Sequence, residues 1–150
     1  MSQPPVELRE IADADLPTLF AYQAEPEGNE MAAFPARDEA AYLAHTAKTR
    51  ADPANVLRSI VAGGRVIGWI SSWDADGERD VGYWIGRDHW GKGYATAALH
   101  AFLAIDPTRP LWAHIAAHNV GSQRVAEHCG FVLEREVQED ILMRIYALPA

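Results

Sequence analysis

The 150-residue sequence has little that would place it outside the cytoplasm. It contains one cysteine, Cys129, which has no second cysteine to form an intramolecular disulfide, so nothing indicates an oxidising compartment. No run approaches the roughly 18 apolar residues of a membrane span. The first five residues lack the basic and apolar regions of a secretory signal peptide. We therefore expect a cytoplasmic protein that does not associate with membranes.

Positive charge is also scarce. Thirteen lysines and arginines oppose 21 aspartates and glutamates, which leaves a formal net charge of −8. This excess opposes binding to the phosphate backbone of nucleic acids and favours a cationic partner at long range. Nucleic acid is therefore not expected as a ligand.

Internal repeats, low-complexity segments and Gly/Ser-rich linkers are absent as well. The chain is 49% hydrophobic and 23% charged, the balance of an ordinary globular domain. A chain of this length buries roughly 68–70% of its unfolded surface and needs no metal or disulfide to fold. We expect residues 1–150 to form one domain.

Hydrophobic periodicity and turn residues predict alternating strands and helices. A strand is expected at 6–11, then a helix capped by Asp13 or Asp15 and extending to Gln23, then a helix at 37–50. The polar stretch 25–30 is expected to be a turn-rich loop. The later elements are three antiparallel strands at 55–62, 65–73 and 79–86, a helix at 91–104, a strand at 110–117, a helix capped by Asn119 and ended by Gly130, and a strand pair at 131–136 and 141–147. This order, β-α-α-β-β-β-α-β-α-β-β, predicts a mixed α/β domain of the α+β type.

The most informative segment is 81–96, VGYWIGRDHWGKGYAT, in which an apolar strand leads through a glycine-rich turn into a helix. Unpaired backbone N–H groups and the helix dipole make such a helix N-terminus an anion site. Gly91 and Gly93 allow the backbone to approach an anion closely. The segment therefore predicts a phosphate-binding loop.

Two well-known phosphate loops do not match this segment. The P-loop pattern G-x-x-x-x-G-K-[ST] is satisfied from Gly86 to Lys92, but Gly93 stands where a magnesium-binding hydroxyl is required. The dinucleotide pattern G-x-G-x-x-G begins at Gly91, but Thr96 replaces its last glycine and no βαβ unit surrounds it.

The segment does resemble the acetyl-CoA loop of the GNAT superfamily of N-acetyltransferases. A second motif, Asn119-x-x-Ser122 followed by Gly130-Phe131, resembles the late helix-to-strand motif of the same superfamily. Together the motifs cover roughly 79–134. Within the superfamily they are most similar to the branch of ribosomal-protein N-terminal alanine and serine acetyltransferases. The resemblance implies a central, mostly antiparallel sheet whose splayed strands hold acetyl-CoA.

The resemblance also implies which residues contact acetyl-CoA. Backbone amides of 91–95, with Thr96 nearby, would hold the pyrophosphate, and the end of the preceding strand would pair with the pantetheine arm. Trp90 replaces the glutamine or arginine that is common in the superfamily. The expected cofactor-binding residues are Ile85, Gly86, Arg87, Trp90, Gly91, Lys92, Gly93, Tyr94, Ala95, Thr96, Asn119 and Ser122.

The catalytic residues are less well defined by the sequence. Ala126 stands where many superfamily members carry a tyrosine that protonates the departing thiolate, so Ser122 is the expected general acid, unless it only bonds its own helix backbone. The spacing selects no general base. The available candidates are Glu25, Glu27, Glu30, Asp74, Asp76 and His118.

The acceptor amine is expected to bind near 22–34, because the acidic residues there suit a cation. The alternative is that these residues only form a charged, solvated loop. The expected acceptor-binding residues are Glu25, Asn29, Met31, Phe34 and Trp69. We expect no metal, because His114 and His118 are four residues apart in a predicted strand and lack a His-Glu-x-x-His context.

The sequence therefore predicts an N-acetyltransferase that transfers an acetyl group from acetyl-CoA to a primary amine by direct attack. The amine belongs either to a protein N-terminus or to a small molecule. The alternative is a non-catalytic acyl-CoA-binding or sensing module, which is compatible with the missing tyrosine at position 126. The chain is expected to be a monomer or a homodimer.

Overall fold

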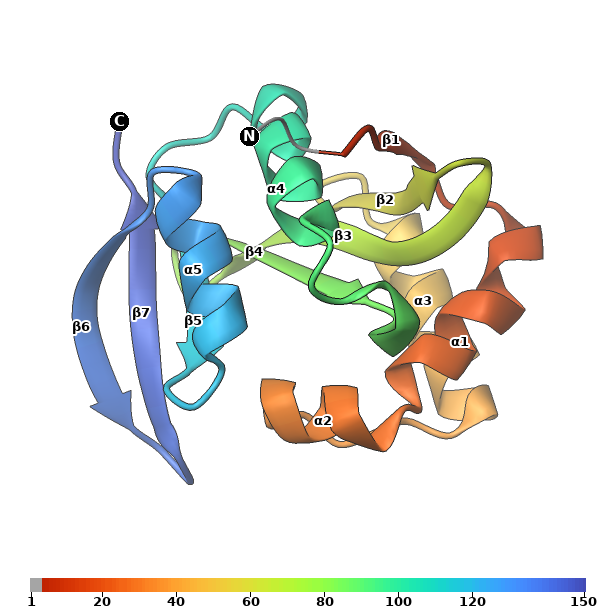
Figure 1. Cartoon of the computed structure of the whole chain (residues 1–150), viewed down its shortest axis with the longest axis horizontal. Coiled ribbons are helices and arrows are strands. Elements are labelled where there is room, and N and C mark those ends of the chain that lie inside the picture. Colours follow the sequence, from red (N-terminus) through yellow and green to blue (C-terminus); the bar gives the residue numbers. More distant parts are fainter. Residues whose placement is uncertain (1–3) are drawn as a thin grey trace.

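The computed structural model describes residues 4–150, which contain a seven-stranded sheet with the order β1-β2-β3-β4-β5-β7-β6 (Figure 1). Adjacent strands are antiparallel except β4 and β5, which are parallel. The strands are β1 (Glu7–Glu10), β2 (Val56–Ala62), β3 (Arg65–Ala75), β4 (Glu78–Ile85), β5 (Leu111–Ala116), β6 (Val132–Gln138) and β7 (Leu142–Leu148). The mixed, mostly antiparallel architecture predicted from the sequence is confirmed.

Helices cover both faces of this sheet. The larger hydrophobic cluster packs α4 and α5 against one face, with Phe102 and Tyr146 fully buried. A smaller cluster around Leu19 and Tyr42 packs α1 and α3 against the other face. None of the helices among residues 4–150 has both the length and the apolar character needed to cross a bilayer. The helices are α1 (Leu16–Gln23), α2 (Pro26–Ala32), α3 (Glu39–Ala51), α4 (Tyr94–Ile105) and α5 (Val120–His128).

Local sequence signals explain most of the element boundaries. Asn119 caps α5 by accepting a hydrogen bond from the Ser122 amide at 3.2 Å, and Gly130 follows the helix with a φ of 93°. Asp76 and Gly77 both have positive φ between β3 and β4, as in a two-residue hairpin turn. The predicted Asn119 cap and the predicted hairpin between β3 and β4 are therefore present.

The helix α2 contradicts the prediction that 25–30 is a turn-rich loop, so three helices rather than two separate β1 from β2. Pro26 occupies the first turn, where its missing N–H costs nothing. Gly28 lies so close to the Trp84 indole that a β-carbon there would be 2.8 Å from Cζ2. Gly28, which suggested a turn, is therefore needed for close packing against Trp84 on β4. Local sequence propensity does not reveal this requirement.

Asp15 is in the predicted position before α1, but its carboxylate does not cap that helix. It accepts hydrogen bonds from the Ala12 amide at 3.0 Å and the Ser59 hydroxyl at 2.9 Å, and it pairs with Arg9. Asp15 therefore ties the start of α1 to β1 and β2.

The pairing of β4 with β5 is short. The two strands share one register pair, Asp80 with Trp112, beyond which they diverge. In Figure 1, β5, β6 and β7 run in a different direction from β2, β3 and β4. This divergence is the splay predicted from the family resemblance, and it opens the sheet beside the N-terminal ends of α4 and α5.

A buried polar network holds the C-terminal end of α4 against β3 and β4. The Asp106 carboxylate accepts hydrogen bonds from the Ser72 hydroxyl, the Thr108 amide and the Arg79 guanidinium, the last at 2.9 Å. Burial alone would raise the pKa of Asp106, but these hydrogen bonds outweigh it and lower the pKa to about 2. The carboxylate is therefore stabilised in its ionised form.

The Asp106→Asn variant is expected to lose roughly 2 kcal/mol of unfolding free energy at pH 7, since the folded state binds the proton less tightly than the unfolded state. This stability is present above pH 4 and disappears as the pH falls to about 2, so the difference from wild type should shrink in that window. Urea titrations at several pH values measure it. Asp74→Asn is the matched control, because Asp74 pairs with the same arginine at an exposed site. An equal loss in both variants would contradict the prediction.

Candidate active site

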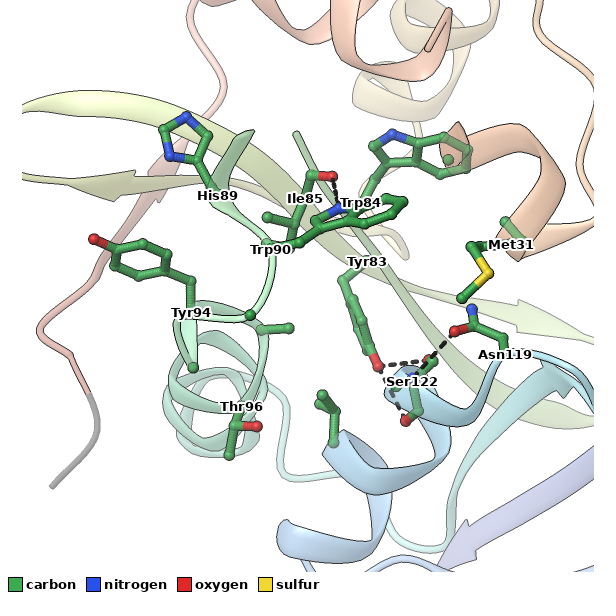
Figure 2. A pocket seen from close by; sticks show the side chains of 17 residues that line it. Met31, Tyr83, Trp84, Ile85, His89, Trp90, Tyr94, Thr96, Asn119 and Ser122 are labelled. Atoms are coloured by element: carbon green, nitrogen blue, oxygen red, sulfur yellow. Dashed lines mark hydrogen bonds between the residues drawn. The ribbon is translucent and has the colours of Figure 1, made fainter. Parts of the chain in front are cut away.

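A cavity of about 350 Å³ opens where β4 and β5 diverge, between α2 and the N-terminal ends of α4 and α5 (Figure 2). Nine of the twelve predicted cofactor-binding residues line it: Ile85, Trp90, Gly91, Gly93, Tyr94, Ala95, Thr96, Asn119 and Ser122. Seven further residues, outside the predicted sites, also line it: Gly28, Ala32, Tyr83, Trp84, His89, Gly121 and Val125. The two sequence motifs thus meet at one site.

The glycine-rich loop presents a row of backbone donors at the start of α4. Gly91 and Gly93 have φ values of 73° and 84°, in the left-handed region that favours glycine. The first helical hydrogen bond runs from the Ala97 amide to the Gly93 carbonyl at 3.1 Å. Within residues 4–150, the amides of 91–96 donate to no protein acceptor. These donors and the helix dipole suit a diphosphate.

The Trp90 side chain connects this loop to β4. Its indole Nε1 donates to the Ile85 carbonyl at the end of β4, at 2.8 Å. Figure 2 shows this hydrogen bond between the loop and the end of the preceding strand. The Trp90 side chain therefore holds the loop against β4, and the backbone amides of 91–96 stay available to a ligand.

Three predicted cofactor residues do not line the cavity. Gly86 packs against the Tyr22 ring, where a β-carbon would be 2.5 Å from Cε1. The Arg87 amide donates to Glu25 Oε1 at 2.9 Å, and its guanidinium lies 3.6 Å from Glu27 Oε1, so Arg87 is paired with α2. Lys92 is exposed, and its ammonium donates to the Asp88 carbonyl at 3.2 Å.

Two hydroxyl groups meet on the floor of the cavity. Ser122 Oγ lies 2.7 Å from the Tyr83 hydroxyl, and both side chains come from elements that bound the splay (Figure 2). Burial raises the pKa of Tyr83 to about 12, although its hydrogen bond with Ser122 lowers it slightly. Tyr83 therefore stays protonated at neutral pH and can donate to Ser122.

Tyr83 was not among the residues singled out as a site from sequence. Ala126 is buried on α5, so the tyrosine hydroxyl that the family resemblance places there is absent. A tyrosine hydroxyl from β4 lies beside Ser122 instead, 39 residues away in sequence. No local pattern connects these two positions.

Of the five predicted acceptor residues, Met31 alone lines the cavity. Trp69 stacks on Trp84, with ring centroids 5.6 Å apart and planes tilted by 2°, and so lies behind the cavity wall. Phe34 is 44% exposed and packs under Arg37. The remaining two, Glu25 and Asn29, are engaged within α2, where the Asn29 amide donates to the Glu25 carbonyl at 2.9 Å.

One candidate base, His118, connects the rims of the cavity. Its Nε2 lies 2.8 Å from the Glu30 carbonyl, although 88 residues separate the two in sequence. The loop between β5 and α5 is thereby linked to α2, which supplies Met31. His118 thus has a structural contact in addition to any role in proton transfer.

Comparison with known proteins identifies a family. Residues 6–132 match the family model described as an acetyltransferase (GNAT) domain. The chain has no significant match to an individual curated protein sequence.

Several solved structures share the fold. An aminoglycoside acetyltransferase, AAC(6')-Ib, in complex with coenzyme A superposes with a TM-score of 0.81 at 18% identity, covering 95% of this chain and 94% of that one. Spermidine N-acetyltransferase from Vibrio cholerae, in complex with CoA and spermine, has a TM-score of 0.82 at 19% identity and covers 95% of each chain. A GNAT-family acetyltransferase from Bacillus anthracis has a TM-score of 0.83 at 17% identity, covering 99% and 96%.

The Gly93→Val variant is expected to raise the dissociation constant for coenzyme A at least tenfold, or about 1.4 kcal/mol. Valine at a φ of 84° is strained and obstructs the row of amides. Isothermal titration calorimetry measures the change. Gly64→Val is the control, because Gly64 also has positive φ but lies in the β2–β3 turn with open space around it. Unchanged affinity in a folded Gly93→Val protein would refute the phosphate assignment.

Proposed function

Because the chain belongs to the GNAT acetyltransferase family, we propose that it is an N-acetyltransferase that transfers the acetyl group of acetyl-CoA to a primary amine. The single observation that carries the proposal is the arrangement of the cavity, in which a row of free amides at α4 lies near the paired hydroxyls of Ser122 and Tyr83. Residues 1–150 form one catalytic domain in this proposal.

The cofactor binds along the splay. The pyrophosphate accepts hydrogen bonds from the amides of 91–96, as the helix dipole and the two positive-φ glycines favour. The pantetheine arm lies beside Ile85 and Asn119, which line the same cavity. The thioester then lies toward Ser122. Lys92, exposed at the loop, adds positive charge near the phosphates in an otherwise acidic protein.

The reaction is a direct acyl transfer. The neutral amine attacks the thioester carbonyl, a carbon–nitrogen bond forms, and the carbon–sulfur bond breaks as the tetrahedral intermediate collapses. The Ser122 hydroxyl donates its proton to the departing thiolate and is supported by the hydroxyl of Tyr83 at 2.7 Å. The proton lost by the amine passes to a base or to water, and water returns a proton to the Ser122 oxygen, which restores its hydroxyl for the next turnover.

The acceptor determines how strong a base is needed. An amine with a pKa near 10.4 costs about 4–5 kcal/mol to deprotonate at pH 7, whereas an α-amine with a pKa near 8 costs only about 1 kcal/mol. A protein N-terminus thus requires little assistance, which agrees with the absence of a clear base in the sequence. The motifs that contain Trp90 and Asn119 resemble those of the branch that acetylates the N-terminal alanine or serine of ribosomal proteins.

Small-molecule amines are the other acceptor class, since the proteins with the same fold include aminoglycoside and spermidine acetyltransferases. The net charge of −8 favours a cationic amine of either class. We therefore propose peptides with N-terminal alanine or serine as the first acceptors to test, with a polyamine and an aminoglycoside beside them.

The function is tested in two stages. Calorimetric titration with acetyl-CoA and separately with ATP–magnesium examines the phosphate loop without knowledge of the acceptor, and acetyl-CoA alone is expected to bind. Thiol release is then measured with the amine panel. Binding without thiol release above background would favour the non-catalytic CoA-binding module, and binding of ATP–magnesium without acetyl-CoA would overturn the assignment.

The Ser122→Ala variant is expected to lower kcat at least tenfold, about 1.4 kcal/mol in the barrier, while the dissociation constant for acetyl-CoA stays within about twofold of wild type. The lost group acts on the leaving thiolate rather than on the cofactor phosphates. Steady-state kinetics and calorimetry together separate the two effects. Ser71→Ala, on β3 outside the cavity, is the control. An unaltered kcat would remove Ser122 from the mechanism.

The Tyr83→Phe variant tests the supporting hydroxyl through the pH profile. With its pKa raised to about 12, Tyr83 stays protonated up to pH 10, so its ionisation gives no alkaline fall in kcat in that range. We expect Tyr83→Phe to lower kcat at all pH values in this range without changing the shape of the profile. A wild-type alkaline limb that disappears in Tyr83→Phe would show instead that Tyr83 ionises during the assay.

A further inference from the structure

Two carboxylates and one imidazole lie together on β4 and β5, away from the cavity. Glu78 begins β4, Asp80 follows on the same face of the strand, and His114 extends from β5. The His114 Nε2 atom lies 3.5 Å from Glu78 Oε1 and 3.6 Å from Asp80 Oδ1. One ligand atom from each residue lies within 4.8 Å of the others. Within residues 4–150, this is the one such group of three or more histidine, cysteine or acidic side chains.

These distances match the ligand shell of a small cation. Zinc binds histidine nitrogen and carboxylate oxygen at roughly 2.0–2.2 Å with tetrahedral geometry, which places ligand atoms roughly 3.3–3.6 Å apart. The two distances from His114 fall in this range. One oxygen from each of the two carboxylates lies within 4.8 Å of the other, and a cation between them would replace their mutual repulsion with attraction.

Asp80 supplies an independent observation. The residue is 8% exposed, and its Oδ1 atom is buried without a hydrogen-bond partner in residues 4–150. Buried carboxylate oxygens are costly unless they are paired or bind a metal. Among residues 4–150, the ion-pair neighbour of this oxygen is His114, which at 3.6 Å is too far away to form a hydrogen bond, so the oxygen can still bind a cation.

Arg135 does not supply a positive charge to Asp80. Its guanidinium lies 3.9 Å from Glu78 Oε2 and packs over the Trp112 ring, whereas His114 contacts the other oxygen of Glu78. The Asp80 carboxylate has no lysine or arginine in an ion pair within the described part of the chain. A cation between the two carboxylates would therefore interact with the Asp80 charge, which no lysine or arginine of the described residues balances.

We propose that Glu78, Asp80 and His114 bind one zinc ion, with water as the fourth ligand. Imidazole nitrogen and carboxylate oxygen form a mixed donor set that zinc accepts readily. The Glu78 and His114 side chains are 27% and 38% exposed, so an ion reaches them from solvent while Asp80 lies beneath.

The place of this site in the sheet explains what the ion does. Asp80 belongs to the register pair that joins β4 to β5, and His114 lies two residues beyond its partner Trp112, where the strands diverge. The ion therefore connects the two halves of the sheet at the point where the splay begins. The expectation of no metal rested on the spacing of His114 and His118. In the proposed site, the other two ligands, Glu78 and Asp80, come from the neighbouring strand β4.

The test uses the full, untagged chain after treatment with a chelator. Zn²⁺ is titrated by calorimetry into the wild type, into His114→Gln and into His100→Gln, which removes an exposed histidine on α4 far from the group in sequence. The wild type is expected to bind one Zn²⁺ with micromolar or tighter affinity. His114→Gln should weaken binding at least about tenfold, whereas His100→Gln should not.

A structural readout accompanies the affinities. On addition of Zn²⁺, the His114 Nε2 resonance in ¹⁵N-edited NMR spectra should shift as expected for coordination, and the melting temperature of the wild type but not of His114→Gln should rise. Equal affinity in wild type and His114→Gln would show adventitious surface binding and overturn the proposal. The absence of a saturable site would also overturn the proposal.

Discussion

The interruption of backbone pairing between β4 and β5 is the constraint on which the rest of this structure depends. A continuous parallel pair would satisfy the backbone groups of both strands and close the space beside α4 and α5. Because pairing is confined to Asp80 and Trp112, the end of β4 faces a cavity instead of a neighbouring strand. The same divergence brings the N-terminal ends of two helices to one opening and so combines amide donors with the Ser122 hydroxyl.

Features encoded by neighbouring residues could be predicted from the sequence. The Asn119 cap, the hairpin turn at Gly77 and the glycine-rich loop each depend on a few adjacent positions, and each lies where expected. The helix α2 could not be predicted in this way. Gly28 is small because Trp84 lies against it, and that contact spans 56 positions of the chain. A composition that indicates a turn locally is outweighed by packing between distant elements.

In the candidate site too, local motifs could be predicted from the sequence, whereas contacts between distant residues could not. Its phosphate loop is a local motif, and most of the residues expected there line the cavity. The partnership of Tyr83 with Ser122, the engagement of Arg87 by α2 and the approach of His114 to Glu78 all join residues far apart in sequence. Such contacts are set by strand register and helix packing, which a single sequence does not specify. Arg87 was expected to contact the cofactor, but its neighbours are Glu25 and Glu27.

The stacked indoles behind the cavity give the protein an optical property as well as a structural one. Trp84 lies in the cavity wall with its ring parallel to Trp69, and Trp90 lines the same space. Two of the five tryptophans in the chain therefore border the site directly. A cofactor that enters the cavity would change the polarity around these rings. The intrinsic emission of the protein is therefore expected to report on occupancy of the cavity without an attached dye.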